Sequence, residues 1–225
     1  MAFDLRTFKT RTLTAIIFAV IMLTGLLWHP IAFIVLFVII HVGCWVEFLL
    51  LLRRITPALW KRYVLFGLLY ITLPIILMID IRLHSLKDVP DNFLKIIPCG
   101  IIFSIWINDT MAYLVGSFVG KTPFSKISTK KTWEGTIGGA ILCVTIISTI
   151  GWYLKVYTIT DWIIIAAICA IFGTFGDLLE SKLKRLANVK DSGTIMPGHG
   201  GFLDRFDSLL IALPFVWLYV YFFVR

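Results

Sequence analysis

Residues 31–52 read IAFIVLFVIIHVGCWVEFLLLL, and Glu47 is the only acidic or basic residue among them apart from His41. A helix of about 20 apolar residues is long enough to cross the hydrocarbon core of a bilayer. Comparable runs recur along the 225 residues, of which 59% are hydrophobic and 15% are charged. A water-soluble core cannot absorb so much apolar surface. We therefore expect an all-α fold, a polytopic bundle of membrane-embedded helices.

The apolar runs leave little room for a separate soluble domain. In order, they predict seven spanning helices, at residues 12–28, 31–52, 63–79, 93–118, 136–153, 162–179 and 208–224. Asn108 and Asp109 interrupt the fourth run, which fits one tilted helix, a helix with an irregular centre, or two shorter pieces. No internal repeat or proline-rich linker is apparent, so we expect residues 1–225 to form a single membrane-embedded domain.

Lysine and arginine are distributed unevenly between the predicted connections. Cytoplasmic connections of membrane proteins carry an excess of these residues. Sixteen of the 21 fall on the side of the N-terminus and of two polar loops, and five fall on the other: Arg82, Lys87, Lys95, Lys155 and Arg225. We therefore expect an integral protein of the cell membrane, with its N-terminus and both polar loops in the cytoplasm and its C-terminus outside.

The net charge of +8 is explained largely by this topology and by attraction to anionic headgroups, so nucleic acid is a poor candidate ligand. The four cysteines lie within apolar runs and form no close pair, which favours core packing over a metal finger or a disulfide framework. The first apolar run ends without a small-residue cleavage site. We expect it to remain as the first helix.

Four acidic residues lie in or beside the apolar runs: Glu47, Asp109, Asp177 and Glu180. A charge at the centre of a bilayer costs about 2.5–3.5 kcal/mol on insertion scales, so such residues usually line a cavity or serve a site. Glu180 precedes Lys184 by one helical turn, which favours a solvated ion pair. Asp177 follows small residues at 173–176 that open space around its carboxylate, which favours a functional role.

Residues 181–207 place acids, bases and glycines between two apolar runs. Asp204 and Asp207 would share one face of a helix and repel each other unless a cation lay between them. The alternative is an ordinary helix start, where acids are favoured by the helix dipole. Glycines at 198, 200 and 201 weaken that alternative, because they let the backbone approach a ligand. We expect Asp177, Asp204 and Asp207 to bind Mg²⁺ together with water and phosphate oxygens.

Residues 116–135 form a second polar segment, rich in hydroxyl and ammonium groups and followed by a helix whose N-terminus adds positive potential. This composition indicates phosphate binding, and a loop that is basic only for topological reasons is the alternative. The Gly-x-x-x-Gly-Lys-Thr sequence at 116–122 is one residue shorter than a P-loop and follows no predicted strand. We therefore reject a P-loop.

The polar residues of these segments resemble the signature of the phosphatidate cytidylyltransferases, also called CDP-diacylglycerol synthases. The family pattern of Ser-x-x-Lys-Arg, Lys-Asp, His-Gly-Gly and Asp-Arg-x-Asp is matched by Ser181, Lys184, Arg185, Lys190, Asp191, His199, Gly200, Gly201, Asp204, Arg205 and Asp207. Two upstream family elements resemble Asp109, Ala112 and Tyr113, and Ser128, Lys130, Lys131, Thr132, Glu134 and Gly135. So many polar positions at fixed spacing rarely coincide by chance.

The resemblance covers the C-terminal half in motif detail, whereas the N-terminal half is similar only in its hydrophobicity and in carrying Glu47. Thr129 replaces a usual proline, Ser117 stands where a base is common, and Met196 replaces a more usual Leu, Ile or Phe. The missing base at Ser117 weakens one expected phosphate contact. The N-terminal half is also shorter than is usual in the family, by about one helix. We therefore expect the surface where lipid enters to differ from the family more than the chemistry does.

The resemblance implies that a phosphate oxygen of phosphatidic acid attacks the α-phosphorus of CTP, giving CDP-diacylglycerol and pyrophosphate for phospholipid biosynthesis. Asp177, Asp204 and Asp207 would bind Mg²⁺. Phosphate contacts would come from Lys130, Lys131, Lys184, Arg185, Lys190 and Arg205. Substrate would be oriented by Ser128, Thr132, Glu134, Ser181, His199, Gly200 and Gly201. Similar proteins form homodimers and use a second, monovalent cation.

Two other functions fit the composition. A CTP-dependent polyprenol or dolichol kinase would share the membrane body and the nucleotide, but it would yield CDP and a phosphorylated alcohol. An ion-coupled transporter would use the intramembrane acids to bind its ion, and its basic loops would serve topology alone. Repeated halves would favour a transporter, and none is apparent in the sequence.

Overall fold

The computed structural model describes residues 5–84, 95–125, 127–128, 131–195 and 200–224. Its helices, in chain order, are α1 (Leu5–Leu27), α2 (Pro30–Ile55), α3 (Trp60–Gly67), the π-helical turn η1 (Leu68–Thr72), α4 (Leu73–His84), α6 (Ile96–Val119), α7 (Trp133–Leu154), α8 (Ile159–Leu186), α9 (Leu203–Tyr219) and the π-helical turn η2 (Val220–Val224). Across these described ranges there is no β-strand, only an isolated bridge between Pro123 and Thr132. The prediction of an all-α fold is confirmed.

Six helical segments of the described chain are long and apolar enough to cross a membrane: Pro30–Ile55, Trp60–Leu83, Ile96–Val119, Trp133–Leu154, Ile159–Leu186 and Leu203–Val224. The apolar part of α1, Thr12–Leu27, is a shorter helix. Each of the seven predicted spans overlaps one of these segments. The chain is therefore a polytopic helical membrane protein, as predicted.

The observed helices differ from the predicted spans mainly at their polar ends. α6 runs unbroken through Asn108 and Asp109, so of the three predicted forms the structure has a continuous helix. α8 continues to Leu186 rather than ending at residue 179, and α9 begins at Leu203 rather than at residue 208. Hydropathy marks only the apolar part of a helix, and these helices extend beyond it. The acids of both ends are thereby placed on rigid elements.

Several helix ends have side-chain caps, which satisfy backbone groups that the first turn leaves unpaired. The Thr132 hydroxyl accepts a hydrogen bond from Gly135 N at the start of α7. Thr158 and Asp161 form a capping box at the start of α8. Pro30 occupies the first turn of α2, where its missing N–H costs nothing.

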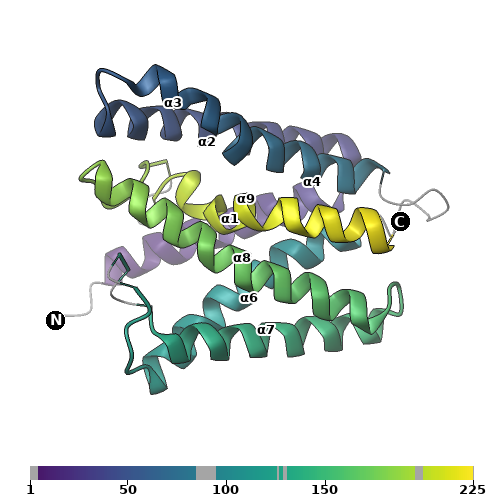
Figure 1. Ribbon diagram of the computed structural model, residues 1–225. Helices are drawn as coiled ribbons and strands as arrows, with labels where there is room; N and C mark the ends of the chain where they lie inside the picture. The colour runs from purple at the N-terminus through teal and green to yellow at the C-terminus, as the bar shows by residue number, and fades with distance from the viewer. Residues whose placement is uncertain (1–4, 85–94, 126, 129–130, 196–199, 225) are drawn as a thin grey trace.

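The helices pack as a layered bundle with α9 near its centre, against α8 on one side and α4 on the other (Figure 1). The side of α9 that faces these neighbours is apolar and buried, including Leu209, Leu213 and Val216. The α6–α7 and α8–α9 connections lie at the same end of the bundle, near the start of α1, while η2 ends at the opposite end (Figure 1). The two polar segments are therefore neighbours in space, as their charges predict.

Candidate functional site

A pocket of about 500 Å³ is lined by residues of the α6–α7 connection and of the helices around it. It lies between α6, the α6–α7 connection, the start of α7, α8 and the first turns of α9. Acidic, basic and hydroxyl side chains dominate its polar lining: Asn108, Asp109, Tyr113, Ser117, Ser128, Lys131, Thr132, Thr136, Thr174, Asp177, Asp204, Arg205 and Asp207. Phe18 of α1 and Ile105 and Trp106 of α6 add apolar surface.

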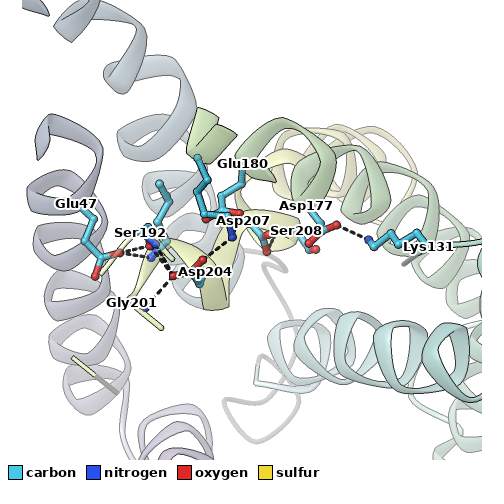
Figure 2. Close-up of polar contacts among 11 residues, drawn as sticks. Glu47, Lys131, Asp177, Glu180, Ser192, Gly201, Asp204, Asp207 and Ser208 are labelled. Atoms are coloured by element: carbon cyan, nitrogen blue, oxygen red, sulfur yellow. Dashed lines mark hydrogen bonds and ion pairs between the residues drawn. The ribbon is translucent and has the colours of Figure 1, made fainter. Parts of the chain in front are cut away.

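Asp177 of α8 and Asp207 of α9 meet because the two helices approach closely. A Cβ at Gly176 would overlap the backbone carbonyl of Asp207, so only glycine admits this spacing. The two carboxylates lie near each other (Figure 2), and Asp109 of α6 faces the same pocket. Of the small residues before Asp177, Gly176 makes room for the backbone of α9, whereas Thr174 lines the pocket together with Asp177. The interpretation of residues 173–176 therefore missed the contact with α9.

Lys131 brings a positive charge to this group of acids. Its Nζ lies 2.5 Å from Asp177 Oδ2, and the two side chains are 28% and 29% exposed (Figure 2). Because the pair is partly open to solvent, its contribution to stability is small. Its position matters more, since it places an ammonium group beside carboxylates on the wall of the pocket.

The α6–α7 connection that carries Lys131 is held by Glu134 in the first turn of α7. The Glu134 carboxylate accepts hydrogen bonds from the backbone N–H groups of Lys121 and Thr122 and from the Thr122 hydroxyl. Backbone bonds from Phe124 N to Lys131 O and from Trp133 N to Thr122 O pair the two ends of the connection. Glu134, which we predicted to bind substrate, holds this loop in the structure.

Both oxygens of the Asp204 carboxylate accept hydrogen bonds. Its Oδ1 accepts from Lys184 Nζ at 2.6 Å. Its Oδ2 accepts from the backbone N–H groups of Ser192 and Gly201, both at 2.8 Å, and lies 2.8 Å from the Ser192 hydroxyl. Asp204 thereby joins α8 to both ends of the segment 192–201 (Figure 2).

Lys184 also contacts Glu180, with 2.5 Å between Nζ and Oε2. The predicted ion pair is present, but the prediction that it is solvated is wrong, because Glu180 is 0% exposed and the Lys184 side chain is 15% exposed. α9 packs against α8 here, and Asp204 of α9, which contacts Lys184, is 20 residues further along the sequence. A buried charge is costly unless paired, and Lys184 here serves two carboxylates.

Glu47 of α2 is a site residue that our predicted set omits. It accepts hydrogen bonds from Phe202 N to Oε1 at 2.9 Å, and from Leu203 N at 2.8 Å and the Ser192 hydroxyl at 2.6 Å to Oε2 (Figure 2). Its place in an apolar run marks it as unusual, but nothing in the sequence indicates its partners. Ser192, the shared partner of Glu47 and Asp204, carries no such signal.

Comparison with known proteins places this site in a family. Residues 58–223 match the model of the cytidylyltransferase family. The chain belongs to the cytidylyltransferase family. It is 46% identical over 113 residues to a protein of Staphylococcus aureus (strain COL) named phosphatidate cytidylyltransferase, and 44% identical over 113 residues to the protein of that name from Staphylococcus haemolyticus (strain JCSC1435). Each match covers 49% of this chain and 43% of the relative.

A plant relative is similar over nearly the same length. Phosphatidate cytidylyltransferase 4, chloroplastic, of Arabidopsis thaliana is 48% identical over 103 residues, which are 45% of this chain and 26% of that protein. The cytidylyltransferase chain described here thus aligns with less than half of the length of these relatives.

The cytidylyltransferase fold brings some of the predicted site residues to the pocket and leaves others away from it. Those that line the pocket are Ser128, Lys131, Thr132, Asp177, Asp204, Arg205 and Asp207. Those that the structure describes outside the lining are Glu134, Ser181, Lys184, Arg185, Lys190, Gly200 and Gly201. Lys130 and His199 lie outside the described residues.

Whether this pocket suits Mg²⁺ can be judged from its oxygen atoms. Mg²⁺ prefers oxygen ligands and usually takes one or two carboxylates, with water and phosphate oxygens completing the shell. Among the residues that the structure describes, no group of three or more acidic, histidine or cysteine side chains is arranged to hold a metal. Asp177 and Asp207 nevertheless supply neighbouring carboxylates, and the 4% exposed Asn108 has a side-chain oxygen without a hydrogen-bond partner. The donor set fits a partly hydrated Mg²⁺ ion.

Proposed function

We propose that this protein is a phosphatidate cytidylyltransferase that transfers CMP from CTP to phosphatidic acid. The main support is a single pocket, in a membrane-embedded member of the cytidylyltransferase family, where Asp177 and Asp207 stand beside Lys131 and Arg205. The relatives named phosphatidate cytidylyltransferase are 44% and 46% identical to this chain over 113 residues. CTP and phosphatidic acid are the proposed substrates.

In the proposed reaction a phosphate oxygen of phosphatidic acid forms a bond to the α-phosphorus of CTP. The bond from that phosphorus to the oxygen bridging to the β-phosphorus breaks, and pyrophosphate leaves with the electron pair. Both reactants are anions, so cations must offset their repulsion and align them. Positioning and charge stabilisation therefore account for most of the catalysis.

The side chains of the pocket suit these two tasks. Asp177 and Asp207 would hold Mg²⁺, which supplies the charge that binds and polarises the triphosphate. Asp204 was predicted as a third ligand, but it accepts hydrogen bonds from Lys184, Ser192 and Gly201, with which the ion would compete. Lys131 and Arg205, which line the pocket, would contact phosphate oxygens. Ser128 and Thr132 offer hydroxyl donors from the same connection as Lys131.

The proposed location of the reaction is the cytoplasmic face of the membrane. Lys and Arg are concentrated in the connections at the pocket end of the bundle, and such connections favour the cytoplasm. CTP would enter the pocket from the cytosol. The acyl chains of phosphatidic acid would stay in the bilayer beside the apolar helix surfaces.

A labelled-lipid assay tests this function with the whole protein in phospholipid nanodiscs. CTP labelled at the α-phosphate, phosphatidic acid and Mg²⁺ should give a labelled lipid and unlabelled pyrophosphate, and a chelator should stop both. Release of CDP with a phosphorylated alcohol would instead indicate a kinase. Absence of any labelled lipid from folded protein would contradict the proposal.

We predict that Asp207→Asn reduces turnover by at least about 100-fold. The neutral amide would hold Mg²⁺ more weakly, so the charge that stabilises the transition state would be lost. Asp80→Asn is the matched control. Asp80 accepts a hydrogen bond from the Trp217 indole on another part of the bundle, and an amide oxygen can still accept it. Equal activity of wild type and Asp207→Asn in the labelled-lipid assay would exclude the proposed role of Asp207.

A further inference from the structure

The carboxylate of Glu47 connects α2 to the start of α9, although Glu47 is more than 150 residues from its partners Phe202 and Leu203 in sequence. Glu47 is 2% exposed, and each of its oxygens accepts a hydrogen bond from a backbone N–H at the start of α9. Backbone N–H groups in the first turn have no partner within their own helix, and the positive end of the helix dipole lies there. The Glu47 carboxylate therefore caps the N-terminus of α9, although it belongs to another helix.

Two glycines show how closely the surrounding segment fits this carboxylate. A Cβ at Gly193 or at Gly201 would overlap the side-chain oxygens of Glu47. Neither glycine has a positive φ, since Gly200 is the one glycine of the described chain that does. Contact with Glu47, rather than backbone conformation, therefore explains why these positions lack a side chain.

Ser192 carries the contact from Glu47 to the pocket. Its hydroxyl lies 2.6 Å from Glu47 Oε2 and 2.8 Å from Asp204 Oδ2, so its one proton can be donated to either carboxylate. Asp204 follows Leu203 directly and lines the pocket, and Asp207 is one helical turn further along the same helix. The position of the α9 start therefore determines where both aspartates lie.

We propose that Glu47 is a positioning residue for the transfer reaction: it fixes the start of α9, and with it Asp204 and Asp207, in the orientation that the pocket requires. The catalytic part of this inference rests on the proposed cytidylyltransferase function. Glu47 precedes residue 58, where the family match begins, so the match does not assign it a role. It does not line the pocket and has no direct contact with substrate to offer.

The first test is Glu47→Gln, which keeps the shape of the side chain but replaces one acceptor oxygen with an NH₂ group. Loss of one hydrogen bond to a charged group corresponds to about a 10- to 100-fold change. We expect kcat to fall by about that factor while KM for CTP changes by less than about threefold, because Glu47 acts on the alignment of Asp204 and Asp207 rather than on binding. Val46→Ala, at the 52% exposed neighbouring position, is the control.

Amide hydrogen exchange gives a readout that needs no substrate. The N–H groups of Phe202 and Leu203 donate to different oxygens of Glu47, and Glu47→Gln keeps only one acceptor oxygen. Exchange of at least one of the two N–H groups should therefore accelerate by at least about tenfold, with the other α9 amides unchanged. Wild-type exchange at both positions, in folded protein, would overturn the proposal. If the wild type made no CDP-diacylglycerol, the proposed function would fail, and accelerated exchange would still establish that Glu47 holds the start of α9.

A double-mutant cycle separates positioning from general damage. Gly193→Ala should lower kcat because its Cβ meets the Glu47 carboxylate, and Glu47→Asp should lower it because the carboxylate withdraws by one methylene, about 1.5 Å. That withdrawal makes room for the new Cβ. The double variant should therefore be at least about fivefold more active than the product of the two single effects predicts. Effects that simply multiply would overturn the proposal, whichever variant is the less stable.

Discussion

At the scale of single residues, the pocket is defined by charges that neutralise one another in part. Lys131 contacts Asp177, while Asp207 lies nearby and Arg205 adds a second positive group. Such a mixture can hold a divalent cation and the phosphates that it binds, because each added anion finds a cation close by. In the proposed reaction, Mg²⁺ bound to Asp177 would replace Lys131 there, and Lys131 would then turn toward a phosphate oxygen.

We predict that Lys131→Gln lowers kcat/KM for CTP by about 10- to 100-fold, as expected for one lost hydrogen bond between charged groups. Lys121→Gln provides the control. Lys121 belongs to the same connection but is exposed and does not line the pocket. Steady-state kinetics in nanodiscs at fixed Mg²⁺ measures both. Equal losses in the two variants would mean that general basicity of the loop, rather than the Lys131 position, attracts the nucleotide.

At the scale of elements, the site depends on the close approach of α8 and α9. Gly176 lies against the backbone of Asp207 and Ser208, where a methyl group has no space. Gly173, one turn earlier on α8, is different, because a Cβ there would lie 3.4 Å from the Ser208 Cβ, an ordinary contact. The same helix thus offers one glycine that the packing requires and one that it does not.

This difference predicts opposite effects of the same substitution. Gly176→Ala should destabilise the protein by about 1–3 kcal/mol through overpacking, and it should displace Asp207 and reduce activity. Gly173→Ala should be neutral or stabilise by up to about 1 kcal/mol, because alanine favours the helix. Thermal unfolding in detergent, followed by tryptophan fluorescence, measures both. Equal destabilisation by the two substitutions would contradict the packing described here.

At the scale of the whole molecule, both polar connections reach one end of the bundle (Figure 1). We predict that a cysteine at Lys121 or Asp191, in a background without the four native cysteines, reacts with a membrane-impermeant thiol reagent only in inside-out vesicles. A cysteine at Lys155 should react only in right-side-out vesicles. The reverse pattern would place the pocket on the outer face and would contradict a site supplied with cytosolic CTP.

Much of this molecule follows from its sequence, because hydropathy alone predicts the spanning helices and their order. The three aspartates that the sequence predicts to bind a metal, Asp177, Asp204 and Asp207, all line one pocket. The burial of Glu180 and the partners of Glu47 could not be predicted, since both depend on packing between helices that are distant in sequence. Local spacing describes one helix face, whereas these contacts join several helices.

The measurement that decides the role of the pocket is Mn²⁺ binding, followed by electron paramagnetic resonance in the presence of CTP. Mn²⁺ takes the same oxygen ligands as Mg²⁺. The wild-type protein should bind Mn²⁺ only when CTP is present. The Asp177→Asn/Asp207→Asn double variant should bind Mn²⁺ at least about 100-fold more weakly, and Asp80→Asn should bind it with wild-type affinity. Unaltered Mn²⁺ affinity in a folded double variant would show that these aspartates do not hold the metal.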